Sequence, residues 1–236
     1  MTRVIKIKLS ISNAYLIKGR KTILVDTGAP REGIKILRAL AGLGIEPKDF
    51  SLILHTHAHM DHVGSTLELK RWVDAPTAVH VSDAAMLASG NMGKVTAINL
   101  EGRIILPFVN KPFPGVKPDI LIKDEISLNE FGVDGRIIFT PGHTTGSISI
   151  LLKNGEAIIG DLLMGGWLGG NLQPTRPNFH YYAEDMNEVR ASIQKLLSYN
   201  PQKLYVGHGG PLDAATVRQF IARDIQSVDE SGQPQV

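Results

Sequence analysis

The stretch Leu52 to Gly64 places four histidines and an aspartate directly after an apolar run that is typical of a β-strand. His57 and His59 are two positions apart, so an extended backbone directs both imidazoles to the same side. Asp61 and His62 follow at once, where the chain is expected to turn. Imidazole and carboxylate groups are ligands that zinc selects, and clustered histidines have no evident stabilising partner without a metal. The HxHxDH pattern therefore predicts a metal site.

Four further apolar strands end in a polar residue that could also bind a metal. In layered sheets flanked by helices, ligands gather at one end of the strands, on loops that a rigid scaffold holds. Residues distant in the sequence are therefore expected to share one rim. His55 belongs to no further motif, and we interpret it as a structural residue or one that supports the ligands. The strand ends are Val25 before Asp26, Thr140 before His143, Ile159 before Asp161 and Val206 before His208, while His80 and His180 stand outside the set.

Apolar periodicity divides the chain into alternating strands and helices. Residues 147–152 and 156–159 flank a Lys-Asn-Gly turn and are expected to form a hairpin. Gly42 and Gly44 are expected to end the first helix, and Asp213 is placed to cap the last one. Strands are predicted at 4–9, 13–18, 21–25, 52–54, 77–81, 125–128, 135–140, 147–152, 156–159 and 203–206, and helices at 32–43, 65–73, 83–88, 185–198 and after 213.

Two segments lack this regular pattern. Residues 89–119 include the proline-rich run Pro107 to Pro118, which cannot be a regular helix and is a poor central strand. We interpret the segment as a long connection across the mouth of the site, with Phe108 and Phe113 as apolar contacts, although a plain surface loop is an equal alternative. The glycine-rich segment 165–182 is expected to be a loop that selects the substrate, unless its aromatics only pack the following helix. Its candidate substrate contacts are Trp167, Arg176, His180, Tyr181 and Tyr182.

Composition restricts the class of protein. At 236 residues, 43% hydrophobic and 20% charged, the chain can bury a core as a single domain, 1–236. We expect two similar halves, 1–120 and 121–226, followed by a flexible tail at 227–236. The absence of cysteine excludes disulfides, thiolate ligands and a cysteine nucleophile.

Charge and hydropathy argue against several partners. The net charge is +2 and no run of Lys or Arg exceeds two residues, so neither a nucleic acid nor a membrane is an expected partner. No apolar window reaches the ~20 residues of a spanning helix. Residues 1–10 alternate like a strand and unlike a signal peptide, so we expect a cytoplasmic protein. Its partner is expected to be a small molecule, and the formation of a homodimer is left open.

Five motifs, in order along the chain, resemble those of the metallo-β-lactamase superfamily: DTG at 26–28, HTHAHMDH at 55–62, PGHTTGS at 141–147, GD at 160–161 and GHG at 207–209. The resemblance spans the chain and implies an α+β fold, a four-layer αββα sandwich of two similar halves. It also implies two Zn²⁺ ions per chain, with iron or manganese as alternatives. Carried over position by position, His57, His59 and His143 would hold the first ion, Asp61, His62 and His208 the second, and Asp161 would bridge both, with Asp26 supporting the ligands.

The Asp26-Thr27-Gly28 motif is also the signature of aspartic proteases. That chemistry needs two such aspartates that share a proton, and this chain has a single DTG. Only a homodimer could supply the pair, and the other motifs would go unexplained. We therefore prefer the metal site.

The donor set and the resemblance predict hydrolysis of an acyl bond. No serine or cysteine stands beside a base, so the expected nucleophile is a hydroxide that bridges the two ions, since zinc lowers the pKa of its water from 15.7 to about 7. Asp61 is expected to orient this hydroxide and to shuttle its proton. The pattern is similar to glyoxalase II thioesterases, so a thioester is the expected substrate. Only 28 residues follow His208, so we expect no counterpart of the helical domain that grips glutathione in full-length members, which argues against specificity for glutathione.

Other branches of the superfamily define the alternatives. Lactonases are similar in their ligands but carry a tyrosine three positions after the bridging aspartate, where this chain has Met164. Tyr181 or Tyr182 could reach the site instead. Hydrolysis of a β-lactam is a second alternative. A third is the persulfide dioxygenase branch, oxidoreductases in which a subset of the ligands holds one iron for oxygen chemistry.

Overall fold

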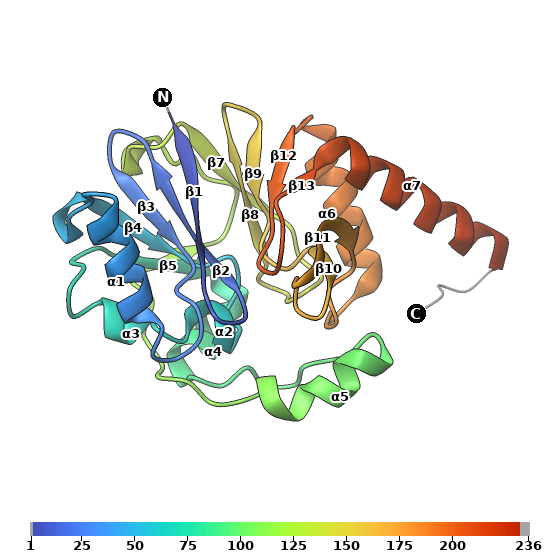
Figure 1. Cartoon of the computed structure of the whole chain (residues 1–236), viewed down its shortest axis with the longest axis horizontal. Coiled ribbons are helices and arrows are strands. Elements are labelled where there is room, and N and C mark those ends of the chain that lie inside the picture. The colour runs from blue at the N-terminus through green and yellow to red at the C-terminus, as the bar shows by residue number, and fades with distance from the viewer. Residues whose placement is uncertain (1, 232–236) are drawn as a thin grey trace.

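The computed structural model describes residues 2–231, which build two β-sheets packed against each other with helices on the outer sides (Figure 1). This arrangement confirms the expected α+β sandwich. The first sheet has the strand order β1-β2-β3-β4-β5-β6 and the second the order β13-β12-β9-β8-β7. The strands are β1 (Arg3–Lys8), β2 (Asn13–Lys18), β3 (Thr22–Val25), β4 (Phe50–Leu54), β5 (Thr77–His80), β6 (Ile120–Ile122), β7 (Gly135–Phe139), β8 (Ile148–Leu152), β9 (Glu156–Ile158), β12 (Lys203–Tyr205) and β13 (Leu212–Asp213).

The first sheet joins an antiparallel edge to a parallel centre. β1, β2 and β3 pair antiparallel, whereas β3 to β6 run parallel to one another. Parallel strands need crossover connections and are buried on both faces, and β3 is buried along its whole length. The connections contain α1 (Gly33–Gly42), α2 (Met60–Val63), α3 (Thr66–Leu69), α4 (Ala84–Ser89) and α5 (Leu100–Val109), with 3₁₀ turns at Pro47–Asp49 and Val81–Asp83.

The second sheet is mainly antiparallel, with β12 parallel to β9. The predicted hairpin is confirmed as β8 and β9. α6 (Met186–Ser198) begins at Asp185, whose carboxylate accepts the N–H groups of Asn187 and Glu188. α7 (Ala214–Ser231) follows Asp213, which caps it as predicted by accepting the N–H of Thr216 at 2.9 Å.

Three apolar clusters produce the four layers. In β2, Ile17 faces Ile150 and the other residues of the core between the sheets, while the adjacent Leu16 faces the opposite way. Leu16 belongs to the cluster that packs α1 onto the first sheet through Ile36 and Leu40. The third cluster packs α6 and α7 onto the second sheet. Each sheet is therefore covered on both faces, which holds the ends of its strands in place.

The segment 89–119 contains a helix that the sequence analysis did not expect. α5 includes Pro107, although the run from Pro107 was expected to lie outside any helix. Asn99 starts the helix by accepting the N–H of Gly102 at 2.8 Å, and Pro107 removes one backbone donor close to the helix end. Phe108 is 74% exposed, so its expected apolar contact is wrong, whereas Phe113 is buried.

The glycine-rich segment 165–182 is largely a hairpin and not the expected loop. Its strands are β10 (Met164–Trp167) and β11 (Leu172–Asn178), and they pair antiparallel. Gly165 permits the pairing, because a Cβ there would lie 1.8 Å from the carbonyl oxygen of Pro174.

Smaller differences concern the edges of the sandwich. The strand expected at 125–128 is reduced to an isolated bridge between Ser127 and Arg136, followed by a 3₁₀ turn at Asn129–Phe131. The helix expected at 65–73 is shortened to α3. α7 continues to Ser231, so the part of the expected tail at 227–231 is helical, and 232–236 lie outside the described residues. Among residues 2–231, no helix combines the length and apolar character needed to cross a bilayer.

Candidate metal centre

Loops at the ends of five strands carry the histidines and aspartates that the sequence singles out. Asp26 follows β3, the histidine cluster follows β4, His143 follows β7, Asp161 follows β9 and His208 follows β12. β3 and β4 are parallel neighbours, as are β9 and β12, so the carboxyl ends of each pair reach the same edge of their sheet. Both sheets thereby deliver side chains to one site.

The carboxylate of Asp161 lies at the centre of this site. Gly207 permits its position, because a Cβ there would lie 1.9 Å from Asp161 Oδ1. Asp161 Oδ2 faces five imidazole nitrogens. Its distance is 3.3 Å to Nε2 of His62, His180 and His208, 3.6 Å to Nε2 of His143 and 3.8 Å to Nε2 of His57.

Two groups of three side chains flank Asp161, and the donor atoms within each group lie within 4.8 Å of one another. In one group, His59 Nδ1 and His143 Nε2 are 2.9 Å apart. In the other, Asp61 Oδ2 is 3.2 Å from His208 Nε2. The structure thus brings together all seven side chains that the resemblance names as ligands, and their role as ligands stays a prediction. The groups are His57, His59 and His143, and Asp61, His62 and His208.

Three imidazoles are oriented by acceptors outside the cluster. Each donates a proton from Nδ1, so a neutral ring keeps its lone pair on Nε2, the atom that faces Asp161. This is the arrangement that a metal-binding histidine requires. The pairs are His62 Nδ1 with Asp26 Oδ2 at 2.8 Å, His143 Nδ1 with the carbonyl of Tyr182 at 2.8 Å and His208 Nδ1 with the carbonyl of Ile11 at 2.6 Å.

Asp26 lies behind His62 and is held by three hydrogen bonds. Besides His62, the backbone N–H and the hydroxyl of Thr56 donate to its two oxygens, each at 2.8 Å. Burial by itself raises the pKa of Asp26, but the adjacent His62 and His55 outweigh it and hold the pKa below its ordinary value. The carboxylate therefore stays ionised and fixes the His62 ring.

His180, which the sequence analysis names only as a candidate substrate contact, belongs to the cluster. It follows β11, is 8% exposed and places Nε2 at 3.3 Å from Asp161 Oδ2. Its Nδ1 accepts the N–H of Tyr182 at 3.3 Å, so the proton of the neutral ring is on Nε2. His180 therefore donates into the site, unlike the three histidines that donate outward. The sequence does not signal its position by an apolar strand, because the strand before it, β11, is mostly polar and exposed.

Electrostatics divide the cluster into two kinds of histidine. Burial by itself lowers the pKa of His208, but Asp161 and Asp61 outweigh it and raise the pKa to about 10. Burial lowers the pKa of His59 to about 4 and that of His143 to about 3. Without a metal ion, the side near Asp61 is therefore protonated at neutral pH and the side near His143 is neutral.

Unpaired buried atoms show that the cluster fits a metal. A buried polar atom without a partner costs about 1–3 kcal/mol, so such atoms are uncommon in folded proteins. Imidazole lone pairs and carboxylate oxygens are the donors that divalent zinc binds. Among the described residues, the atoms of this cluster without a hydrogen-bond partner are His57 Nε2, His62 Nε2, His208 Nε2 and Asp161 Oδ1.

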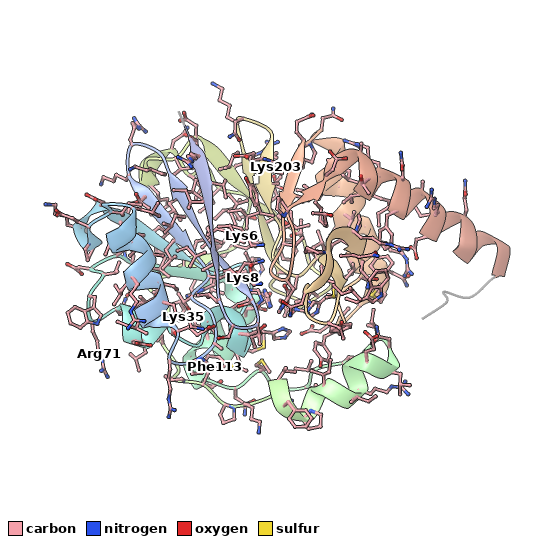
Figure 2. All side chains as sticks on the ribbon, in the orientation of Figure 1. Lys6, Lys8, Lys35, Arg71, Phe113 and Lys203 are labelled. Atoms are coloured by element: carbon pink, nitrogen blue, oxygen red, sulfur yellow. The ribbon has the colours of Figure 1, made fainter. Side chains whose placement is uncertain are left out.

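Two charged side chains outside the cluster hold its loops, and the sequence analysis identified neither. Asp83 is buried, and its Oδ2 accepts the N–H of Ala58 and the hydroxyl of Thr144, each at 2.9 Å. It thus ties the HxH loop to the loop of His143, and burial raises its pKa to about 6. Figure 2 shows Lys6 between β1 and the C-terminal half, where its ammonium group donates to the carbonyl of Gly209, beside His208, at 2.5 Å.

The other candidate residues divide between the cluster and the surface. Tyr181 and Tyr182 are buried and line a cavity beside the cluster. Trp167 and Arg176 pack against each other within the hairpin, with the guanidinium carbon of Arg176 4.7 Å from the centroid of the Trp167 ring. Neither residue lines the cavity beside the cluster.

Two histidines lie outside the cluster. His55 is fully buried, with Nε2 at 3.2 Å from the hydroxyl of Thr66. His80 stacks on Phe139 with a centroid distance of 4.4 Å. Within residues 2–231, His55 Nδ1 has no hydrogen-bond partner and lies 3.9 Å from Asp26 Oδ1, behind the cluster. Among the described residues, neither histidine belongs to a group of side chains that could hold a metal.

Comparison with known proteins agrees with this geometry. The family model described as the metallo-beta-lactamase superfamily matches residues 7–208. A probable metallo-hydrolase of Methanocaldococcus jannaschii is 34% identical over 202 residues, which are 84% of this chain and 87% of that protein. An atrochrysone carboxyl ACP thioesterase of Aspergillus fumigatus is 26% identical over 93% of this chain and 57% of its own length.

Solved structures show the same fold. The BLEG-1 B3 metallo-beta-lactamase superposes with a TM-score of 0.67 at 20% identity, covering 93% of this chain and 97% of its own. The family match over residues 7–208 and the metallo-hydrolase relative at 34% identity show that the chain is a metal-dependent hydrolase and belongs to the metallo-β-lactamase superfamily.

Proposed function

We propose that the enzyme hydrolyses a thioester with two divalent cations, most simply zinc, held by the seven clustered side chains. His57, His59 and His143 would hold the first ion, and Asp61, His62 and His208 would hold the second. Asp161 is shared, because its Oδ2 faces imidazole nitrogens from both groups. The convergence of these nitrogens on one carboxylate is the observation that carries the proposal.

The chain's own groups then position and move the proton. Bound zinc supplies Lewis acidity and lowers the pKa of water to about 7. Asp61 lines the cavity and is part of the second group, so it is placed to orient the attacking water and accept its proton. Burial by itself raises the pKa of Asp61, but in the metal-free protein His62 and His208 hold it well below its ordinary value, so the carboxylate is ionised and can accept a hydrogen bond from the attacking water.

His180 supplies a hydrogen-bond donor to the substrate. Its Nε2–H points into the cluster, and its Nδ1 already accepts a hydrogen bond from the N–H of Tyr182. The neutral ring therefore has no lone pair free for a metal there. A donor at this place stabilises the negative charge that develops on a carbonyl oxygen or a leaving sulfur. We therefore assign His180 to the substrate and not to the metal.

Two features favour a thioester over other acyl substrates. A thiol has an ordinary pKa of about 8.5, so a thiolate departs without a strong acid beside it, unlike an amine. The thioesterase relative from Aspergillus fumigatus supports the same class. The lactonase alternative requires a tyrosine hydroxyl at the cluster, yet Tyr182 Oη donates to the carbonyl of Gly102 at 3.0 Å and Tyr181 Oη accepts the N–H of Gly169 at 3.5 Å.

The test is a panel of a thioester, a lactone, a β-lactam and a phosphodiester, assayed on zinc-loaded enzyme whose metal content is measured. We expect turnover of the thioester. His59→Ala should lose at least one bound ion and most of the activity, whereas His80→Ala, which removes a histidine outside the cluster, should keep both. Turnover of another class with the thioester untouched would contradict the proposal, as would one iron per chain with full activity, which would favour the dioxygenase branch.

A further inference from the structure

A cavity of about 140 Å³ opens directly on the cluster. One end is polar, with His59, Asp61, Asp161, His180 and His208 on its lining. The remainder of the lining is almost entirely apolar. A molecule that fills it must therefore be polar at one end and apolar at the other.

The apolar walls come from two segments that pack on each other. α5 and the chain before it contribute Met92, Val95, Ile105 and Val109. The hairpin and the loop after it contribute Met164 and Tyr181, and the same residues form one apolar cluster with the α5 side chains. Figure 1 shows α5 below the hairpin, away from both sheets. The wall therefore depends on a short helix that lies outside the five sequence motifs.

Backbone hydrogen bonds fix this wall to the loop that carries His180. The N–H of Ile98 donates to the carbonyl of Tyr181 at 2.9 Å, and the N–H of Ala183 donates to the carbonyl of Thr96 at 3.1 Å. Gly102 lets α5 approach closely, because a Cβ there would lie 2.7 Å from the carbonyl oxygen of Tyr181. The cavity is thus built by specific contacts and has a defined shape beside the cluster.

We propose that this cavity holds the acyl chain of the substrate and selects an apolar acyl group of about six carbons. A cavity of about 150 Å³ with apolar walls holds a benzene molecule, which sets this size. The inference rests on the proposed thioester hydrolysis and specifies its substrate class. The carbonyl carbon lies at the cluster, and the alkyl chain lies between Ile105 and Met164. An acyl group with a polar far end, such as a succinyl group, would place its terminal carboxylate against walls that offer no partner, so it is a poor substrate.

Acyl-chain length is the first measurement. In a series of N-acetylcysteamine thioesters, kcat/KM should rise about fourfold for each added methylene that is buried, up to about six carbons, and then level off or fall. The succinyl thioester should be hydrolysed at least about tenfold more slowly than the butyryl thioester, which has the same number of carbons. Equal rates across the series, or a preference for succinyl, would overturn the inference.

Adjacent residues of α5 provide a matched pair of variants. Ile105 lines the cavity, whereas Ile104 is 63% exposed and is not part of the cavity lining. Ile105→Trp should lower the ratio of hexanoyl to acetyl turnover at least tenfold, because the indole fills space that the chain needs. Ile104→Trp should leave this ratio unchanged. Equal ratios in the two variants would overturn the inference.

A binding measurement separates this inference from the proposed function. Hexanoate titrated calorimetrically into the zinc-loaded enzyme should bind more tightly than acetate, with a negative change in heat capacity. Ile105→Trp should weaken this binding and Ile104→Trp should not. If no thioester is hydrolysed, the proposed function fails, while this binding pattern would still support an acyl cavity. If thioesters are hydrolysed but hexanoate binds no better than acetate, only the cavity assignment fails.

Discussion

At the scale of single residues, the orientation of each imidazole depends on a partner outside the cluster. The Asp26 carboxylate accepts a hydrogen bond from His62 Nδ1, and backbone carbonyls accept hydrogen bonds from His143 Nδ1 and His208 Nδ1. His180 has the opposite polarity because a backbone N–H faces its Nδ1. Residues of one chemical type can therefore serve as ligand or as donor, according to the backbone group beside them.

Substitution of Asp26 tests this control. Asp26→Asn keeps the size but leaves one acceptor oxygen for three donors, so the His62 ring loses its fixed tautomer. We expect a loss of about 10- to 100-fold in affinity for one of the two proposed zinc ions, measured by competition with a chelating dye. Asp213→Asn is the matched control, because asparagine caps a helix as well as aspartate does. Unchanged affinity in Asp26→Asn would contradict the role given to this residue.

At the scale of elements, α5 is the helix that forms a wall of the cavity beside the cluster. It lies outside both sheets and is held by apolar contacts with Met164 and Tyr181 and by the hydrogen bond from Tyr182 Oη to the carbonyl of Gly102. Elements with few buried contacts open more easily than a sheet core. The wall of the cavity is therefore expected to open locally without unfolding of the sandwich.

Removal of one hydroxyl measures how firmly α5 is held. Tyr182→Phe deletes the hydrogen bond to Gly102, which contributes about 1 kcal/mol. Amide hydrogen exchange of residues 100–109, measured by mass spectrometry, should accelerate about fivefold. The exchange rates of the sheet strands should stay unchanged. Tyr205→Phe removes a hydroxyl that donates to Glu156, far from α5 in the sequence and in the fold, and serves as the control. Exchange at 100–109 that stays at the wild-type rate would show that apolar contacts alone hold the helix.

At the scale of the whole molecule, the site joins the two halves of the sandwich. The first sheet supplies His57 and Asp61 through the loop after β4, and the second supplies Asp161 and His208. Packing of the sheets therefore brings buried titratable groups together, and the stability of the fold depends on their protonation. The histidines that are neutral in the folded protein make its stability sensitive to acid.

Acid should destabilise the metal-stripped protein. Burial lowers the pKa of His59 to about 4 and those of His143 and His180 to about 3. As pH falls below about 6.5, the unfolded chain takes up protons at these residues and the folded chain does not, so stability decreases toward pH 4. Each histidine contributes up to about 1.4 kcal/mol per pH unit. The difference between the urea midpoints of unfolding at pH 7 and pH 5 measures this loss of stability, and His59→Gln should reduce the difference. Equal midpoints at the two pH values would contradict the prediction.

Alkaline pH acts through a different histidine. The folded-state pKa of His208 is raised to about 10, so its stabilising contribution is complete below about pH 6.5 and is lost as pH rises through 10. The metal-stripped protein is therefore expected to be most stable near neutral pH.

The sequence alone predicted a metal site at the HxHxDH cluster from local patterns, and the resemblance of the ordered motifs to a known family implied the sandwich and the set of seven side chains. The alternation of His57 and His59 on an extended backbone and the apolar runs before Asp161 and His208 are short-range signals, and the ordered motifs resemble a family with this fold. Strands such as β2 and β8 follow from their apolar periodicity for the same reason.

Only the tertiary structure decided which side chains reach the cluster from irregular segments. His180 joins it, and Asp83 holds its loops from outside, through contacts between residues far apart in the chain. The hairpin at 164–178 pairs where glycines permit a close approach. α5 forms despite Pro107 because a cap at Asn99 and packing on Tyr181 outweigh local propensity. Such long-range contacts leave no periodic trace in the sequence, so the cavity that they enclose could not be predicted from it.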